Sequence, residues 1–175
     1  GSEIEILYKQ EDFEKYQELL KKNVLDGNFV PGKKSLGNIL LTGATGFLGA
    51  HVFDALMCEE SGKIYCLIRG GAEKLMEMLH YYFGDKYDAE IGKRILPVVG
   101  DITNPDLSLD IPDDVQTIIH TAASVKHYGS YQYFHDINVQ GTQNVIDYAK
   151  QIRAKLIHIS TISVSGNSFA DAFAV

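Results

Sequence analysis

The stretch that decides the fold is Asn38-Ile39-Leu40-Leu41-Thr42-Gly43-Ala44-Thr45-Gly46-Phe47-Leu48-Gly49. An apolar run leads directly into a Gly-x-x-Gly-x-x-Gly turn, and a helical pattern follows at once. Residues without a Cβ let a ligand approach the turn, and the N–H groups and positive dipole end of the following helix attract phosphate. Glycine clusters alone usually mark ordinary turns, but strand, turn and helix stand here in the order that a dinucleotide pyrophosphate requires.

Downstream of this turn, strand and helix patterns alternate. The strand patterns are nearly continuous apolar runs, as expected when helices cover both faces of a parallel sheet. Pro97 interrupts one of them and is tolerable if that strand lies at an edge of the sheet. The sequence therefore predicts an α/β fold with a doubly wound parallel sheet, a Rossmann fold. We expect strands over residues 38–42, 63–68, 95–99, 115–121 and 155–160, and helices near 47–59, 71–83 and 138–152.

An amphipathic segment precedes the sheet. Apolar residues recur at helical spacing over residues 11–25, and a loop rich in glycine follows them. Gly1-Ser2 has the form of a tag remnant. We therefore expect residues 1–35 to contain the tag remnant, a linker helix and a loop, and residues 36–175 to form the dinucleotide-binding domain.

Composition narrows the class of protein. The 175 residues are 45% hydrophobic and 22% charged, which is typical of a globular domain. A net charge of -7 argues against a nucleic-acid surface, and the absence of a long apolar run argues against a membrane span, so we expect a cytoplasmic protein. Cys58 and Cys66 are expected to be small buried residues and not a disulfide. His120 and His158 are expected in the core, and no metal-ligand spacing is present.

The ends of the predicted strands indicate which dinucleotide would bind. An NAD site usually has Asp or Glu after the second strand, whereas this chain has Arg69, which can pair with the 2′-phosphate of NADP. The alternative is an ordinary surface arginine. After the third strand, Asp101 can accept a hydrogen bond from the adenine amino group while Ile102 packs on the ring. Ala122 and Ala123 follow the fourth strand and leave room for the cofactor, although close packing of strand and helix would also explain them.

Hydroxyl groups follow the fifth predicted strand. A hydroxyl at this end of the sheet lies at the crevice where ligands bind, and it can stabilise an oxyanion as hydride reaches a carbonyl carbon. Spacing does not choose among the four candidates, which are Ser160, Thr161, Ser163 and Ser165.

Taken together, these motifs resemble the extended short-chain dehydrogenases/reductases. More narrowly, the chain resembles the terminal thioester reductase domains of nonribosomal peptide synthetases, whose relatives include carboxylic acid and fatty acyl reductases. The resemblance covers residues 38 to about 166 and rests most specifically on Gly-Phe-Leu-Gly combined with Arg69. The other matching segments are Gly100-Asp101, His120-Thr121-Ala122-Ala123, Asn138-Val139-Gln140-Gly141-Thr142 and Ser160-Thr161-Ile162-Ser163-Val164.

The resemblance implies roles for individual residues. Thr161 matches the family's catalytic hydroxyl, and Arg69 would bind the 2′-phosphate. Asn138, expected to open the helix before the fifth strand, matches an asparagine that steadies the site, although it could equally be an ordinary helix cap. The remaining implied cofactor-binding residues are Gly43, Thr45, Gly46, Phe47, Leu48, Gly49, Asp101, Ile102, Ala122 and Ala123.

One departure from the family concerns the general acid. The family uses a tyrosine with a lysine four residues later, downstream of the position of Thr161, and the 14 residues after Thr161 contain neither. Tyr82 and Lys86 have this spacing but precede the third strand, so we interpret them as lying away from the site. The chain is therefore expected to be the cofactor-binding part of a longer enzyme and to be inactive alone.

The function implied by the resemblance is NADPH-dependent release of a carrier-bound peptidyl or acyl thioester as an aldehyde or an alcohol. The implied partner is a carrier protein bearing a phosphopantetheine thioester, and the domain would be a monomeric part of a larger synthetase. Three alternatives stay open: a fatty acyl or carboxylic acid reductase, a nucleotide-sugar epimerase or dehydratase, and a non-enzymatic dinucleotide-binding module.

Overall fold

The computed structural model describes residues 35–126 and 128–161. The predicted linker helix over residues 11–25 lies outside these residues, and the domain boundary near residue 35 stays a prediction.

Five parallel strands form one sheet in the order β3-β2-β1-β4-β5. Chain order therefore runs outward from β1 to one edge and then from β4 to the other, which is the doubly wound arrangement predicted from the sequence. β3 is an edge strand, so Pro97 removes no ladder donor from the sheet's interior. The strands are β1 (Ile39–Thr42), β2 (Ile64–Ile68), β3 (Ile95–Val99), β4 (Thr117–His120) and β5 (Lys155–His158).

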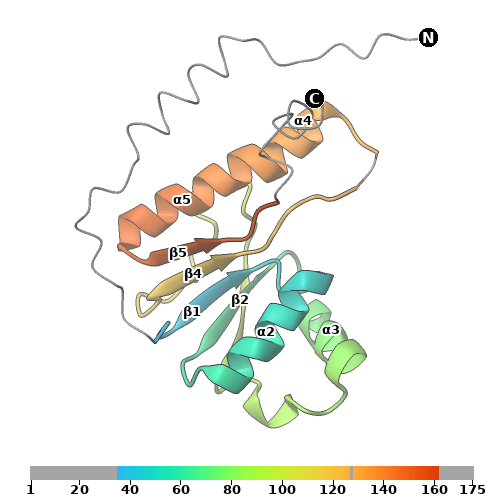
Figure 1. Ribbon diagram of the computed structural model, residues 1–175, viewed down its shortest axis with the longest axis vertical. Helices are drawn as coiled ribbons and strands as arrows, with labels where there is room; N and C mark the ends of the chain where they lie inside the picture. Colours follow the sequence, from blue (N-terminus) through green and yellow to red (C-terminus); the bar gives the residue numbers. More distant parts are fainter. Residues whose placement is uncertain (1–34, 127, 162–175) are drawn as a thin grey trace, which may run out of the picture. The chain divides into compact units, whose positions relative to one another are not determined.

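Helices cover both faces of the sheet (Figure 1). Alternate residues of a strand point to opposite faces, and β1 shows the result. Ile39 and Leu41 join a core under α2 and α3 that includes Phe53, whereas Leu40 joins a second core under α5 that includes Val145. The helical segments are α2 (Phe47–Glu59), α3 (Glu73–Phe83), the short 3-10 segment η1 (Asp88–Glu90), α4 (Tyr131–Phe134), the π-helical η2 (His135–Gln140) and α5 (Gly141–Ile152).

Several predicted boundaries differ from the structure. The helix expected to begin at residue 138 begins at Tyr131, because Ser130 caps it by accepting a hydrogen bond from Tyr133 N at 3.2 Å. The fourth and fifth strands are shorter than predicted, covering Thr117–His120 and Lys155–His158.

Two predictions of burial were wrong. Cys66 is buried in β2 as expected, but Cys58 is exposed near the end of α2. His120 is buried as predicted, whereas His158 is exposed on edge strand β5 and stacks on the His120 ring at 5.1 Å between centroids. Edge position explains the second error, because one side of such a strand has no neighbour in the sheet.

Candidate functional site

The turn between β1 and α2 requires glycine at two positions for different reasons. Gly43 has φ +74°, a conformation that side chains rarely adopt, and a Cβ there would lie 2.7 Å from Ala122 N. At Gly49 a Cβ would lie 2.0 Å from Gly43 O, so the first turn of α2 packs directly on the loop. These contacts bring the ends of β1 and β4 and the start of α2 together.

Gly46 differs from the other two glycines of the motif. Its φ is −84°, and a Cβ there would meet nothing closer than Gly43 O at 3.4 Å. The fold itself therefore tolerates a side chain at this position. Since Gly46 lines the pocket described below, its missing side chain leaves room beside the backbone for a ligand.

The N-terminus of α2 carries an unneutralised positive end. No side chain caps the helix, and no acidic residue stands in its first turn. The amides of Phe47, Leu48 and Gly49 form that turn, and N–H groups in this position have no intrahelical acceptor. The Phe47 side chain is 71% exposed and that of Leu48 is 48% exposed. Neither Phe47 nor Leu48 is among the residues that line the pocket described below, and their assignment as cofactor-binding residues stays a prediction.

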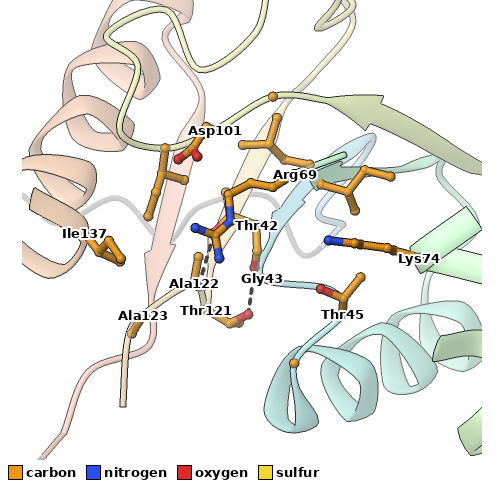
Figure 2. A pocket seen from close by; sticks show the side chains of 15 residues that line it. Thr42, Gly43, Thr45, Arg69, Lys74, Asp101, Thr121, Ala122, Ala123 and Ile137 are labelled. Atoms are coloured by element: carbon orange, nitrogen blue, oxygen red, sulfur yellow. Dashed lines mark hydrogen bonds between the residues drawn. The ribbon is translucent and has the colours of Figure 1, made fainter. Parts of the chain in front are cut away.

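A pocket of about 290 Å³ lies at the carboxyl ends of the strands (Figure 2). The loops after β1, β2, β3 and β4 all contribute to it, as expected at the point where strand order reverses. Eight of the predicted cofactor-binding residues line it: Gly43, Thr45, Gly46, Arg69, Asp101, Ile102, Ala122 and Ala123.

Two cations lie on one side of this pocket. Arg69 follows β2 and extends over the β1 turn, and Lys74 reaches toward the turn from the start of α3 (Figure 2). Both side chains are exposed, and neither forms a hydrogen bond or ion pair with any residue in 35–126 or 128–161. Two cations without an acidic partner suit an anionic group such as phosphate.

The loop after β3 forms another part of the wall. Gly100 N donates to Ile68 O at 2.9 Å, and Asp101 Oδ1 accepts a hydrogen bond from Thr103 N at 2.9 Å. This turn holds the Asp101 carboxylate at the pocket. Ile102 is 7% exposed, and its carbonyl oxygen accepts a hydrogen bond from Asn144 Nδ2 at 2.8 Å.

A buried polar network supports the turn from below. Thr42 Oγ1 lies 2.7 Å from His120 Nδ1 and accepts a hydrogen bond from Ala122 N at 3.3 Å. His120 Nε2 lies 3.0 Å from Thr142 Oγ1 on α5. Burial, reinforced by the neighbouring His158, lowers the pKa of His120 to about 4, so its imidazole is neutral at pH 7. This network joins β1, β4 and α5 beneath the pocket.

Asn138 does not open a helix, contrary to the sequence interpretation. It lies inside η2, and its side chain binds the backbone of Ser124 twice. Ser124 N donates to Asn138 Oδ1 at 2.7 Å, and Asn138 Nδ2 donates to Ser124 O at 3.0 Å. Asn138 is absent from the pocket lining and instead ties the loop after β4 to the helix.

Thr161 follows β5 by three residues. It is exposed and is not among the pocket-lining residues. The competing Ser160 is also exposed, while Ser163 and Ser165 lie outside the described residues. The choice of Thr161 as the catalytic hydroxyl stays a prediction.

Several lining residues were not predicted from the sequence. Lys74 stands in the first turn of a helix that follows Arg69, and a basic residue in that place was a usable signal. Ile137 was missed because the helix start was predicted too late in the sequence.

The tyrosine–lysine pair at Tyr82 and Lys86 is absent from the pocket lining, and Lys86 instead pairs with Asp54 on α2 at 2.6 Å.

Within residues 35–126 and 128–161, no group of His, Cys, Asp or Glu side chains has the arrangement of a metal site. No helix in the described part of the chain is long and apolar enough to cross a membrane.

Comparison with known proteins identifies the domain. Residues 41–173 match the model of an NAD-binding domain family described as "Male sterility protein". A linear gramicidin synthase of Brevibacillus parabrevis is 36% identical over 135 residues, which are 70% of this chain and 3% of that protein. A protein of Drosophila melanogaster named as a fatty acyl-CoA reductase, CG8303, is 32% identical over 146 residues, which are 75% of this chain and 27% of that protein.

Comparison with a solved structure supports the same family. The thiolation-reductase di-domain of an archaeal non-ribosomal peptide synthetase superimposes with a TM-score of 0.72 and 38% sequence identity. The match covers 93% of this chain and 45% of that one, so the chain spans less than half the length of each of these three proteins. With its Rossmann sheet and glycine turn, the chain belongs to the male sterility protein family of NAD-binding domains, whose structural neighbours include terminal reductase domains of nonribosomal peptide synthetases.

Proposed function

We propose that this chain binds NADPH and is part of a reductase that converts a phosphopantetheine-bound acyl or peptidyl thioester to an aldehyde. The observation that carries the proposal is the pair of cations beside the glycine turn, Arg69 and Lys74, neither of which has an acidic partner among the described residues. NAD and NADP differ by the 2′-phosphate. A site without an acidic residue at the end of β2 and with two cations there favours NADP.

The pocket's other residues fit the rest of such a cofactor. The α2 N-terminus and the space beside Gly46 suit the pyrophosphate. Asp101 and Ile102 offer an acceptor and an apolar surface for the adenine. Ala122 and Ala123, at the end of β4, leave room on the nicotinamide side.

The reaction proposed is a two-electron reduction. Bound NADPH would supply the hydride. Thr161 would donate a hydrogen bond to the oxygen of the thioester carbonyl and stabilise the negative charge that develops there. Hydride adds to the carbonyl carbon, and the electrons of the carbon–oxygen double bond move to the oxygen. When that double bond re-forms, the carbon–sulfur bond breaks, which gives an aldehyde and a thiolate that takes up one proton from solvent. Asn138 would contribute indirectly, by holding the loop after β4 in place.

The relatives support two sources of the thioester. Similarity to peptide synthetases supports a carrier protein as the partner, and similarity to a fatty acyl-CoA reductase supports a soluble acyl-CoA. Both carry the same phosphopantetheine arm. We favour the carrier protein, because the solved relative with 38% identity joins its reductase to a thiolation domain.

An assay of the full-length protein to which this chain belongs tests the proposal. The protein is given NADPH and either an acyl carrier protein or an acyl-CoA, and NADPH oxidation and aldehyde formation are followed together. Equal amounts of NADPH consumed and aldehyde formed from the carrier-bound substrate are expected. Consumption from acyl-CoA alone would replace the carrier by a soluble substrate, and turnover of a nucleotide sugar would contradict the proposal.

A further inference from the structure

A buried leucine in an unusual backbone conformation stands in the loop after β3. Leu107 has φ +57°, a left-handed conformation that is unfavourable for a residue with a Cβ. Among the described residues, Arg153 is the other non-glycine residue with a positive φ, and it ends α5, where this conformation is common. Leu107 ends no helix. Such strain persists only where the surroundings hold it, so its place beside a ligand pocket calls for an explanation.

The side chain of Leu107 anchors the loop in the core. It is fully buried and belongs to the core under α5, together with Ile102 and Val145. Between Thr103 and Asp110 it is the single buried residue, since the others are exposed or half-buried. Burial of this apolar side chain offsets the unfavourable backbone conformation.

The backbone of Leu107 is tied to Asp101, which lines the pocket (Figure 2). Asp101 N donates a hydrogen bond to Leu107 O at 2.9 Å, and Leu107 N donates to Asn104 O at 3.0 Å. The Leu107 carbonyl also packs closely on the end of β3, because a Cβ at Gly100 would lie 2.4 Å from its oxygen. The position of Leu107 therefore fixes the backbone that carries the Asp101 carboxylate.

Helix α5 holds the next residue, Ile102, which also lines the pocket. Asn144 is 6% exposed, and its Nδ2 donates to Ile102 O at 2.8 Å. A Cβ at Gly141 would lie 2.9 Å from Ile102 Cδ1, so the isoleucine side chain packs directly on the start of the helix. Asp101 and Ile102 are thus held in place by contacts within the protein itself.

We propose that Leu107 is a positioning residue for recognition of the adenine base. Its buried side chain and left-handed backbone hold the loop so that the Asp101 carboxylate meets the exocyclic amino group of adenine and Ile102 packs on the ring. The inference rests on the proposed binding of NADPH and deepens it, because it assigns selection of the base to a residue outside the pocket lining. A carboxylate held in advance loses little freedom on binding, and it repels a base that carries an oxygen in place of the amino group.

Two dinucleotides that differ at this base test the assignment. NADP+ and its hypoxanthine analogue, in which a carbonyl oxygen replaces the amino group, are titrated by calorimetry into the full-length protein to which this chain belongs. The unmodified protein is expected to bind NADP+ at least about tenfold more tightly than the analogue, which corresponds to one good charge-assisted hydrogen bond.

Substitutions at Leu107 separate backbone conformation from buried volume. Leu107→Ile keeps the volume but adds a branch at Cβ that disfavours a positive φ, so the preference for NADP+ should fall to about threefold or less. Leu107→Met has no such branch and should retain the preference. Leu79→Ile is the matched control, because Leu79 is 1% exposed in the core on the other face of the sheet, and it should also retain the preference.

A second measurement needs no variant. Exchange of backbone amide hydrogens is followed by mass spectrometry in the peptide that covers residues 100–108 of the unmodified protein. The amides of Asp101, Asn104 and Leu107 donate hydrogen bonds within this loop, so they should exchange slowly before NADP+ is added and little more slowly afterwards. Protection that arises only after NADP+ binds would mean that the ligand orders the loop, and it would overturn the inference.

The outcomes separate this inference from the proposed function. Equal affinity of the unmodified protein for NADP+ and the hypoxanthine analogue would contradict the inference and leave the use of NADPH standing. An unchanged preference in Leu107→Ile would contradict it as well, and so would an equal loss of preference in Leu79→Ile. Failure of the unmodified protein to bind either dinucleotide would overturn the proposed function, and the inference with it.

Discussion

Basic side chains at the two ends of the sheet differ in whether they have partners among the described residues. At the amino ends of the strands, polar side chains bind one another. Asp114 accepts hydrogen bonds from Asn38 Nδ2 at 2.9 Å and Tyr65 OH at 2.7 Å, and it pairs with Lys63 at 3.5 Å. At the carboxyl ends, Arg69 and Lys74 have no such partners among the described residues.

The two arginines that flank strands make the contrast sharpest. Arg94, just before β3, donates to Glu60 O at 2.5 Å, Gly62 O at 3.3 Å and Met57 O at 3.5 Å. It thereby satisfies carbonyl groups at the end of α2. Arg69, just after β2, makes no hydrogen bond within residues 35–126 and 128–161. Satisfied polar groups stabilise the fold, whereas groups held without partners indicate where a ligand would bind.

Substitutions at two glycines of the turn are expected to give the largest effects, and they should distinguish loss of stability from loss of cofactor binding. Gly49→Ala forces a Cβ against Gly43 O and is expected to lower the free energy of unfolding by about 3 kcal/mol, with loss of cofactor binding. Gly46→Ala should leave stability nearly unchanged while weakening NADPH binding, because its Cβ would fill space beside the backbone. Urea unfolding and calorimetry measure the two effects. Equal loss of stability in both variants would mean that Gly46 also serves the fold.

Arg69→Ala is the next largest expected effect. Under the proposed assignment, it removes charge-assisted hydrogen bonds to the 2′-phosphate and weakens NADP+ binding by about 30-fold, with little change for NAD+ and in stability. Calorimetric titration with both dinucleotides checks this. An equal loss of affinity for NADP+ and NAD+ would mean that Arg69 does not bind the 2′-phosphate.

Arg94→Ala is the corresponding substitution at the amino ends of the strands. Loss of its three carbonyl contacts should lower the free energy of unfolding by about 2 kcal/mol and leave the preference between NADP+ and NAD+ unchanged. The measurement is urea unfolding beside the same pair of titrations. A changed cofactor preference would contradict the division between the two ends.

The buried histidine beneath the pocket predicts a dependence on pH. The pKa of His120 is about 4 in the folded chain against 6.5 for an unperturbed histidine, so the unfolded state binds more protons between these values. Stability should therefore fall as pH drops from about 6.5 toward 4, by at most about 1.4 kcal/mol per pH unit from this group. Urea unfolding at pH 7 and pH 5 should show a smaller loss in His120→Gln. Identical losses would remove His120 as the cause.

Lys74→Ala should have the smallest effect of the set. An exposed lysine on a flexible stem contributes less than an arginine, so NADP+ affinity should fall by about fivefold, again with little change for NAD+. Fluorescence or calorimetric titration at low and moderate salt would measure it. The loss should shrink as salt rises, and a salt-independent loss would point to packing and not to charge.

Local patterns predicted much of this molecule. The apolar runs located β2 within one residue and β3 without error, and the Gly-x-x-Gly-x-x-Gly motif located the pocket's turn. Both the apolar runs and the glycine motif are patterns of residues that are close together in the sequence. The doubly wound parallel sheet was also predicted correctly, since strand and helix alternation restricts a parallel sheet to few topologies.

Other features depend on contacts that local patterns do not contain. The start of the helix at Tyr131 was missed because the π-helical turn over His135–Gln140 breaks the 3.6-residue periodicity. The partners of Asp114 come from residues as far as 76 positions away.

The most direct test of the account compares NADP+ and NAD+ binding to the unmodified chain by calorimetry at fixed ionic strength. Cations held without partners at the end of β2 predict that NADP+ binds at least about tenfold more tightly than NAD+. Equal affinity for the two dinucleotides would contradict the claim that these cations are held for a 2′-phosphate.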